Sequence, residues 1–340
     1  MNVLIDINHP AHVHLFKNAI WELERDGHTV KITARNKDIA LELLDEYDFD
    51  YTVLSNEGNS FVGLAAEFTK RVIGVSRVAN DFSPDVYLGL NPAICYASKF
   101  VGGKSIILHD TEPATLKEQL FNPVADEILT PECFKKELNG NQVRYPGYHE
   151  LAYLHPDQFD PDPSVLDKTE LSPNDQFAIV RLVSWESSHD VGDSGFDNVQ
   201  DVVSMLETND FDVLITSEAE LEDSLKDYQV SISPSQIHDL MYYSDLYVGE
   251  SATMATESAV LGTPSVLISS NTRGYTDELN EYGLVFSYSS DKRHKKGVKK
   301  VEKIVQGELD SDWEQKRQRV LKDKIDTTSY LVERIKNANT

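Results

Sequence analysis

Short apolar runs alternate with longer amphipathic stretches along the first half of the chain. The runs are rich in Val, Ile and Leu and lie at 3–7, 29–34, 51–54, 86–90, 105–109 and 127–130. Short continuous runs of this kind are typical of strands in a parallel sheet that is covered on both faces. The stretches between them have helical periodicity and lie at 11–26, 37–47, 61–82, 92–101 and 114–121. Strand, helix and strand in repeated order predict a doubly wound parallel sheet.

The alternation stops between Tyr145 and Asp175. This stretch is rich in aspartate and contains five prolines, Pro146, Pro156, Pro161, Pro163 and Pro173. Proline lacks a backbone donor and interrupts both helices and central strands. The stretch is therefore predicted to link two domains, at 1–155 and 156–340.

The second half resumes the same alternation. Strands are predicted at 177–183, 213–216, 246–248 and 265–268, helices at 195–207, 235–243 and 253–261, and two polar helices at 291–306 and 311–337. The last helix is long enough to cross back and pack on the first domain. The fold class is therefore α/β, with two tandem Rossmann-like domains. In such sheets ligands bind beyond the carboxyl ends of the strands, which predicts a site in the cleft between the domains.

Composition and charge narrow the class of protein. The chain has 57 acidic and 32 basic residues and a formal net charge of −25, which disfavours a non-specific nucleic-acid binder. The acids are dispersed, as in proteins adapted to high salt, although an ordinary acidic cytoplasmic protein has the same composition. No stretch is apolar enough to span a membrane, and the first residues read as a buried strand, so a cytoplasmic location is expected. Cys95 and Cys133 lie in unrelated segments, which predicts free thiols.

The segment 247–268 contains the clearest chemical pattern. A strand ends at Val248, the small residues Gly249, Ser251, Ala252 and Thr253 follow, and a helix begins with Ser251 or Thr253 as N-cap. The first-turn amides of a helix are unpaired and can bind a phosphate without a basic residue. Glu257, one turn further on, can accept hydrogen bonds from a ribose diol. The alternative is that Ser251 only caps the helix and that Glu257 only favours its N-terminal half.

The order Gly249-Glu-Ser-Ala-Thr-Met-Ala-Thr-Glu257, then Ala259 and Leu261-Gly-Thr-Pro264, resembles the signature of UDP-N-acetylglucosamine 2-epimerases and related glycosyltransferases. The resemblance implies a glycosyltransferase-B-like fold, with Ser251, Ala252 and Thr253 contacting a diphosphate and Glu257 the ribose. Asn91 stands where these epimerases would have an acid. That difference weakens the implied epimerase reaction more than it weakens nucleotide-sugar binding.

The first loop, Asp6-Ile-Asn-His-Pro-Ala-His-Val-His-Leu-Phe-Lys17, contains His9, His12 and His14. It resembles the acceptor-side loop of the lipid-linked N-acetylglucosamine transferase of peptidoglycan synthesis. Over its whole length the chain is identified as a member of an uncharacterised glycosyltransferase-B-like family with an N-terminal Asn-His-Pro-x-His-x-His pattern. His12 and His14 point apart on a helix, so no metal site is predicted here. The three histidines are candidates for acid–base catalysis or anion binding, with local capping or packing as the alternative.

Three further segments follow predicted strands and add candidates. Arg181, Ser184 and His189 follow the first strand of the second half, where a basic, histidine-containing loop occurs in the epimerases; an ion pair is the alternative for Arg181. Asp110 and Glu112 follow a strand of the first half, and either of them fits the catalytic carboxylates of the epimerases. Arg273 and Tyr275 lie in a loop at 271–277 that is expected to face the sugar, or to be a solvated turn.

Three functions are compatible with these residues. The first is a metal-independent glycosyltransferase with a UDP-type donor, in which His12 or His14 activates a sugar or lipid-linked acceptor. The second is a UDP-sugar 2-epimerase that uses carboxylates at 110–112. The third is a non-catalytic nucleotide-sugar-binding protein. No separate cofactor is expected, and a homodimer is one option for the assembly.

Overall fold

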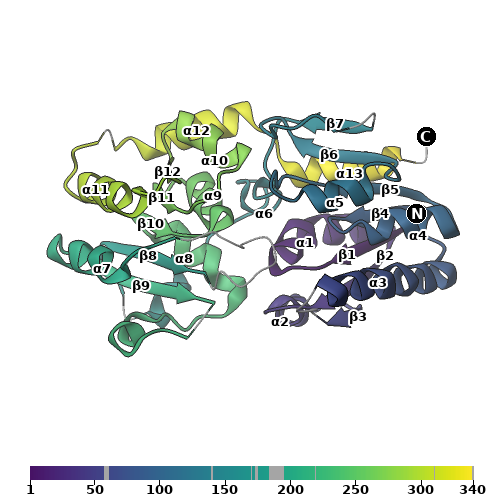
Figure 1. Cartoon of the computed structure of the whole chain (residues 1–340), viewed down its shortest axis with the longest axis horizontal. Coiled ribbons are helices and arrows are strands. Elements are labelled where there is room, and N and C mark those ends of the chain that lie inside the picture. The colour runs from purple at the N-terminus through teal and green to yellow at the C-terminus, as the bar shows by residue number, and fades with distance from the viewer. Residues whose placement is uncertain are drawn as a thin grey trace. The chain divides into compact units, whose positions relative to one another are not determined.

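The computed structural model describes residues 1–56, 61–138, 141–169, 171–172, 175–183, 195–218, 220–309 and 311–338, with backbone alone for 61–64. The chain forms two compact units. The first contains Met1–Gln158 together with Ile325–Thr340, and the second contains Phe159–Lys324. Both are shown in Figure 1.

The first unit is built on a parallel sheet of seven strands in the order β3-β2-β1-β4-β5-β6-β7. Its strands are β1 (Asn2–Ile7), β2 (Thr29–Asn36), β3 (Tyr51–Asn56), β4 (Val86–Gly89), β5 (Lys104–Leu108), β6 (Glu127–Pro131) and β7 (Gln142–Tyr145). Its helices are α1 (Pro10–Arg25), α2 (Ala40–Glu46), α3 (Phe61–Phe82), α4 (Ala93–Val101), α5 (Thr115–Phe121), α6 (Leu151–Leu154) and α13 (Thr327–Asn337).

The central strand β1 shows why the apolar runs become buried strands. Ile5 pairs with Ile32 on one side and with Leu88 on the other. Leu4 belongs to a cluster of buried side chains from β4, β5 and helices α3 and α4. Because both faces of this strand are covered, an uninterrupted apolar run is the sequence that suits it.

The second unit contains a parallel sheet of five strands in the order β12-β11-β10-β8-β9. Its strands are β8 (Phe177–Leu182), β9 (Asp212–Ser217), β10 (Leu246–Gly249), β11 (Ser265–Ile268) and β12 (Val285–Tyr288). Its helices are α7 (Val199–Thr208), α8 (Ile237–Tyr243), α9 (Ala252–Leu261), α10 (Gly274–Tyr282), α11 (Arg293–Val305) and α12 (Trp313–Asp323), with short 3₁₀ turns η1 (Pro163–Lys168), η2 (Asp223–Tyr228) and η3 (Pro234–Gln236).

Each sheet has a point where the strand order reverses. In the first unit β1 lies between β2 and β4, and in the second unit β8 lies between β9 and β10. The loops that leave these neighbouring strands in opposite directions open a crevice at the carboxyl edge of the sheet, where ligands bind in open α/β sheets. The loops after β1 and β4, and those after β8 and β10, are therefore the places to look for a site.

The structure corrects several sequence-based expectations. Strands β7 and β12 and helix α10 were not predicted, and the short helix α6 lies inside the proline-rich stretch that was predicted to be irregular. The helix predicted at 311–337 is two helices, because Asp326 caps a new one. Its carboxylate accepts hydrogen bonds from the Thr328 and Ser329 amides at 2.9 and 3.3 Å.

Helix α13 is part of the first unit, although it lies at the end of the chain. Its residues hold the segment after β7. The Ile325 amide donates to the Pro146 carbonyl at 2.9 Å, and Thr327 Oγ1 donates to the Tyr148 carbonyl at 2.7 Å. Thr328 Oγ1 donates to the Ala152 carbonyl at 2.6 Å. The C-terminal segment thus fixes the backbone on both sides of residue 149.

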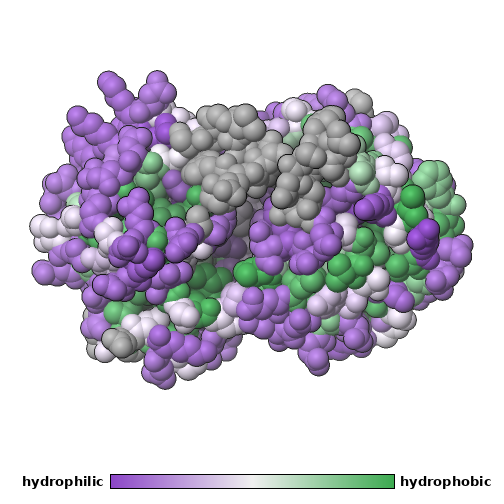
Figure 2. Space-filling model, turned by 60° about the horizontal axis from the view of Figure 1, so that its bottom comes forward, coloured by the Kyte–Doolittle hydropathy of each residue, from purple (hydrophilic) through white to green (hydrophobic). Residues whose placement is uncertain are grey.

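The polarity of the surface and the state of the two cysteines are those expected from the sequence. The face in Figure 2 is dominated by hydrophilic side chains, with smaller apolar areas between them, as the charge of −25 leads one to expect. Cys95 and Cys133 form no disulfide with each other, and Cys95 is buried. No helix in the described part of the chain is long and apolar enough to cross a membrane.

Candidate functional site

In the second unit, the loop after β10 leads directly into α9. Ser251 is the N-cap, and its Oγ accepts a hydrogen bond from the Met254 amide at 3.3 Å. Ala252 and Thr253 begin the first turn, so their amides point out of the helix end, as expected for an anion site. Packing also requires a small residue at position 249. A Cβ there would lie 2.4 Å from the Tyr247 hydroxyl oxygen, so packing against Tyr247 requires glycine.

Glu257 lies one turn beyond this helix end and is almost fully buried. Its side chain is hydrogen-bonded to His238 of α8, with 3.0 Å between Glu257 Oε1 and His238 Nε2. His238 is 2% exposed and Glu257 4% exposed. A buried carboxylate with a histidine partner is held in one orientation, as a ribose contact would need. His238 was not predicted to belong to the site.

Arg181 is the penultimate residue of β8 and lies opposite Gly249, where this loop begins. Its guanidinium forms an ion pair with Glu218, with Nη2 and Oε1 2.6 Å apart. The ion-pair alternative considered from the sequence is therefore present in the structure. The Nε atom of Arg181 is buried and has no hydrogen-bond partner among the described residues.

Glu250, the residue before the N-cap, was not predicted to contribute. Its two carboxylate oxygens accept hydrogen bonds from the Val183 amide at 2.9 Å and the Phe196 amide at 2.8 Å. A Cβ at Gly195 would lie 1.8 Å from the same carboxylate. Glu250 therefore fixes both ends of the loop that follows β8. The predicted candidates Ser184 and His189 belong to that loop and lie outside the described residues.

The loop predicted at 271–277 is in part helical, because α10 begins at Gly274. The Arg273 amide donates to Thr276 Oγ1 at 3.2 Å, and its guanidinium donates to the Thr272 carbonyl at 3.2 Å. Tyr275 is 5% exposed and packs in the first turn of the helix. Arg273 thus stays at the carboxyl edge of the sheet, whereas Tyr275 is a core residue rather than part of an open loop.

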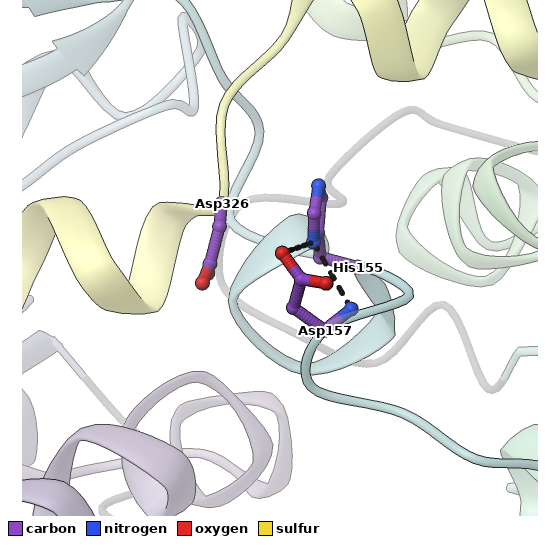
Figure 3. A group of neighbouring side chains, drawn as sticks. All are labelled: His155, Asp157 and Asp326. Carbon is purple, nitrogen blue, oxygen red and sulfur yellow. Dashed lines mark hydrogen bonds and ion pairs between the residues drawn. The ribbon is translucent and has the colours of Figure 1, made fainter.

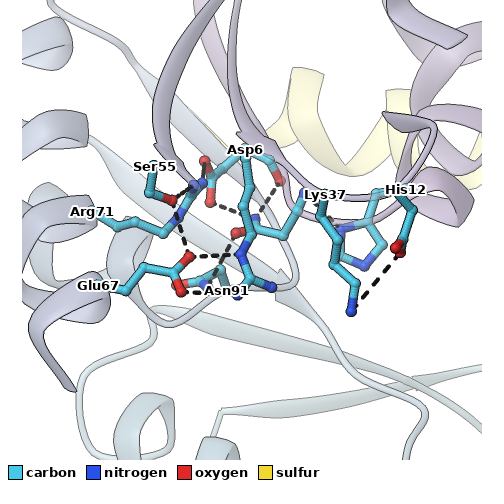
Figure 4. Close-up of polar contacts among 10 residues, drawn as sticks. Asp6, His12, Lys37, Ser55, Glu67, Arg71 and Asn91 are labelled. Carbon is cyan, nitrogen blue, oxygen red and sulfur yellow. Dashed lines mark hydrogen bonds and ion pairs between the residues drawn. The ribbon is translucent and has the colours of Figure 1, made fainter. Parts of the chain in front are cut away.

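In the first unit, a buried polar network lies under the loop after β1 (Figure 4). Asp6 is fully buried and accepts hydrogen bonds from Arg71, from Thr33 at 2.7 Å and from Asn8 at 2.8 Å. Asn91, which follows β4, donates to Asn8 Oδ1 at 3.2 Å. The network therefore joins the loops on both sides of the strand-order reversal.

The network continues through a second ion pair. Ser55 Oγ accepts from Arg71 at 3.0 Å and donates to Glu67 at 3.0 Å, and Arg35 donates to the other Glu67 oxygen at 2.8 Å. Arg71 is 1% exposed. The sequence analysis missed these residues, because they come from β2, β3 and α3 and have no common local motif.

The three histidines of the first loop have different surroundings. His9 is the N-cap of α1, and its Nδ1 accepts from the Ala11 amide at 3.2 Å. The His14 ring is buried between Tyr47 and Tyr153, with centroid distances of 6.0 and 5.5 Å. His12 Nδ1 accepts from the Asn8 amide at 3.3 Å. His9 thus has a capping contact and His14 has packing contacts, whereas His12 lies close to a separate group of charged side chains.

That group contains Asp110 and His149. Their Oδ2 and Nδ1 atoms are 2.9 Å apart, and both side chains are largely buried. Burial alone would raise the pKa of Asp110, but the charge and hydrogen bond of His149 and the hydrogen bond of Thr111 hold it well below its usual range. Burial, with the nearby His9 and Lys117, lowers the pKa of His12 well below its ordinary value. Asp110 is therefore a carboxylate at neutral pH, and His12 is a neutral imidazole.

Glu112, the other predicted carboxylate, has a structural contact. Its Oε1 accepts a hydrogen bond from the Lys135 amide at 3.3 Å. The structure therefore places Asp110 close to His12 and His149, and it gives Glu112 a contact to the Lys135 backbone. His149 comes from the loop after β7, a strand that the sequence analysis did not predict.

Another cluster in the first unit, His155, Asp157 and Asp326, has ligand atoms within 4.8 Å of one another (Figure 3). The carboxylate of Asp326 is already used by the protein. It caps α13 and accepts from Gln158 at 2.8 Å and from Ser329 Oγ at 2.6 Å. Asp157 is 79% exposed and pairs loosely with His155 at 3.5 Å. These contacts explain the cluster as a turn and a helix cap.

Comparison with solved structures identifies the architecture. A Staphylococcus aureus protein, described as MnaA in a structure with UDP, superposes with a TM-score of 0.70 at 11% identity, over 98% of this chain and 96% of that one. The UDP-GlcNAc 2-epimerase of Neisseria meningitidis bound to UDP-GlcNAc gives 0.67 at 13% identity, over 98% and 99%. The glycosyltransferase VinC in complex with dTDP gives 0.63 at 12% identity, over the full length of both chains. These likenesses confirm the glycosyltransferase-B-like fold expected from the sequence.

Sequence comparisons agree with this relation. An uncharacterized protein of Methanocaldococcus jannaschii is 26% identical over 282 residues, which are 78% of this chain and 81% of that protein. The family model described as "Protein of unknown function (DUF354)" matches residues 1–340 of the chain, which therefore belongs to this family.

Proposed function

We propose that this protein is a metal-independent glycosyltransferase that uses a UDP-type sugar donor, with the nucleotide held by the second unit. The observation that supports this most is the position of the α9 N-terminus. It follows β10, which is next to the point where the strand order of the sheet reverses, and it is capped by Ser251. Glu257 lies one turn further on and is hydrogen-bonded to His238. The unpaired first-turn amides would hold the diphosphate, and Glu257 would hold the ribose.

The charges of the first unit favour transfer over epimerisation. An epimerase of this kind would need a carboxylate base near 110–112, and a carboxylate with a strongly lowered pKa is a weak base. An imidazole with a pKa near neutrality is better suited to take the proton of an acceptor hydroxyl. The 2-epimerase remains the second candidate, because the fold is shared with enzymes described by that name and Asp110 is placed at the carboxyl edge of the sheet.

The first experiment is a thermal-shift screen with UDP, GDP, NAD and UDP-sugars. A ligand at 100 times its dissociation constant stabilises the folded state by about 2.7 kcal/mol, so UDP should raise the melting temperature and GDP and NAD should not. Stabilisation by NAD alone, or by none of the compounds, would contradict the proposal.

Two variants, Ser251→Ala and Glu257→Gln, locate the nucleotide. Asp312→Ala, on α12, is the control for Ser251→Ala, because each of the two loses a helix cap worth about 1 kcal/mol. Of these two, only Ser251→Ala should also weaken UDP binding. Glu257→Gln should weaken it about 10-fold or more, because the ribose loses a charged acceptor.

The reaction is decided by product analysis with UDP-GlcNAc. Formation of a 2-epimer without any acceptor supports the epimerase. Release of UDP that depends on an added alcohol, sugar or lipid-linked acceptor supports the transferase. Binding of UDP without either product in such a screen favours a non-catalytic binding protein.

A further inference from the structure

His149 has a polar atom that the fold places in a buried position without using it. The imidazole is 9% exposed, Nδ1 contacts the Asp110 carboxylate, and Nε2 is buried with no hydrogen-bond partner among the described residues. An unsatisfied buried polar atom costs about 1–3 kcal/mol, so it calls for an explanation, and a catalytic role is one of those known for such atoms.

The Asp110 contact also determines which ring nitrogen carries the proton. A carboxylate accepts hydrogen bonds, so Nδ1 of His149 is the donor in this contact. In the tautomer with a single ring proton, Nε2 therefore carries the lone pair. A histidine held in this tautomer by a carboxylate is arranged to accept a proton at Nε2, and the carboxylate stabilises the imidazolium that results.

The surrounding backbone keeps the ring in place. The Tyr148 carbonyl accepts from Thr327, and a Cβ at Gly147 would lie 2.9 Å from Thr327 Oγ1. The segment before His149 is therefore packed tightly against the start of α13, which leaves it little freedom to move.

We propose that His149, oriented by Asp110, is the general base for the acceptor hydroxyl. This inference rests on the proposed glycosyltransferase function. In the step, Nε2 takes the hydroxyl proton of an alcohol acceptor as its oxygen bonds to the anomeric carbon. The bond between that carbon and the diphosphate oxygen breaks, and UDP leaves with the electron pair. His12, which the sequence analysis named together with His14 as a possible base, is a neighbour that keeps a neutral ring.

The test measures UDP affinity and UDP release from UDP-GlcNAc in the full chain, with water and with alcohol acceptors. His149→Ala should lower turnover at least 100-fold, consistent with the usual contribution of acid–base catalysis, and leave UDP affinity within twofold. Added imidazole should restore at least a tenth of the lost rate in His149→Ala. His149→Asn, which keeps a donor toward Asp110, should fold normally and be equally slow.

His155→Ala is the matched control, since His155 also pairs with an aspartate in the same unit, and its turnover should stay within twofold of the unchanged chain. Normal turnover in both His149 variants, or a loss that imidazole does not restore, would overturn the assignment while UDP binding still supports the proposed function. A chain that binds UDP but releases none from UDP-GlcNAc with any acceptor also overturns it. Absence of UDP binding in the unchanged chain would instead refute the proposed function, and this inference with it.

Discussion

The buried ion pair between Asp6 and Arg71 should be essential to the stability of the first unit. The informative change is Arg71→Met, which keeps most of the side-chain length and removes the charge. In the unchanged protein Arg71 donates to Asp6 and to Ser55, and neither charged side chain is exposed by more than 1%.

The expected loss in the free energy of unfolding follows from this burial. Removing one partner of a buried pair leaves the other charge uncompensated and typically costs about 3–5 kcal/mol. Thr33 and Asn8 still donate to Asp6 in the variant, so the loss should stay within that range. For a unit of this size it corresponds to a fall in melting temperature of roughly 6–20 °C.

The assay is urea unfolding of Arg71→Met, Asp6→Asn and the double variant, with hydrogen exchange measured by mass spectrometry to locate the effect in β1 and α3. The double variant should lose less unfolding free energy than the two single variants lose together, because it leaves no uncompensated buried charge. Lys99→Met is the control, since the pair of Lys99 and Asp126 is exposed and worth about 1 kcal/mol or less. A loss in Arg71→Met no larger than in Lys99→Met would refute the reasoning.

Four further predictions concern both units. Gly249→Ala should destabilise the second unit by about 1–3 kcal/mol in chemical unfolding, because the added Cβ meets the Tyr247 hydroxyl. Adding Tyr247→Phe to this variant should recover part of the lost stability. Thr327→Val should cost about 1 kcal/mol through the lost bond to Tyr148 and should lower turnover while UDP affinity stays constant; equal turnover would show that α13 does not position His149. Because the pKa of Asp110 is lowered in the folded state, its carboxylate stabilises the fold at pH values above the unfolded pKa of about 4, and this contribution disappears as the pH falls further. Below about pH 4, the melting temperature of Asp110→Asn should therefore fall less than that of the unchanged chain. If the dispersed acidity reflects adaptation to salt, the melting temperature should rise with KCl concentration; a flat curve would leave an ordinary acidic protein.

Most of the fold could be predicted because buried parallel strands have an unmistakable local pattern. The runs at 3–7 and 265–268 match β1 and β11 to within one residue. Strands β7 and β12 were missed because Gln142-Val-Arg-Tyr145 and Val285-Phe-Ser-Tyr288 lie at sheet edges and contain polar residues. The break before α13 was missed because polar residues continue across it, and only the cap at Asp326 shows where a new helix begins.

The candidate site was predictable where its residues are close in sequence. Ser251 and Glu257 share one helix, so their spacing alone indicates a helix end with a carboxylate beyond it. His238 and His149 could not be found in this way. His149 meets Asp110 only because β5, β6 and β7 are neighbours in the sheet, which is a property of the folded chain. The pairing of Arg181 with Glu218 likewise depends on β8 and β9 lying side by side.

The return of the last helix to the first unit has a consequence for biosynthesis. Residues 1–158 leave the ribosome early, but the segment that secures Pro146, Tyr148 and Ala152 follows only after residues 159–324 have been made. At usual elongation rates this is a wait of about 10–30 s. During that time the nascent N-terminal sheet lacks the partner that holds the loop of His149. The half of the protein that is translated first is therefore the half that is completed last.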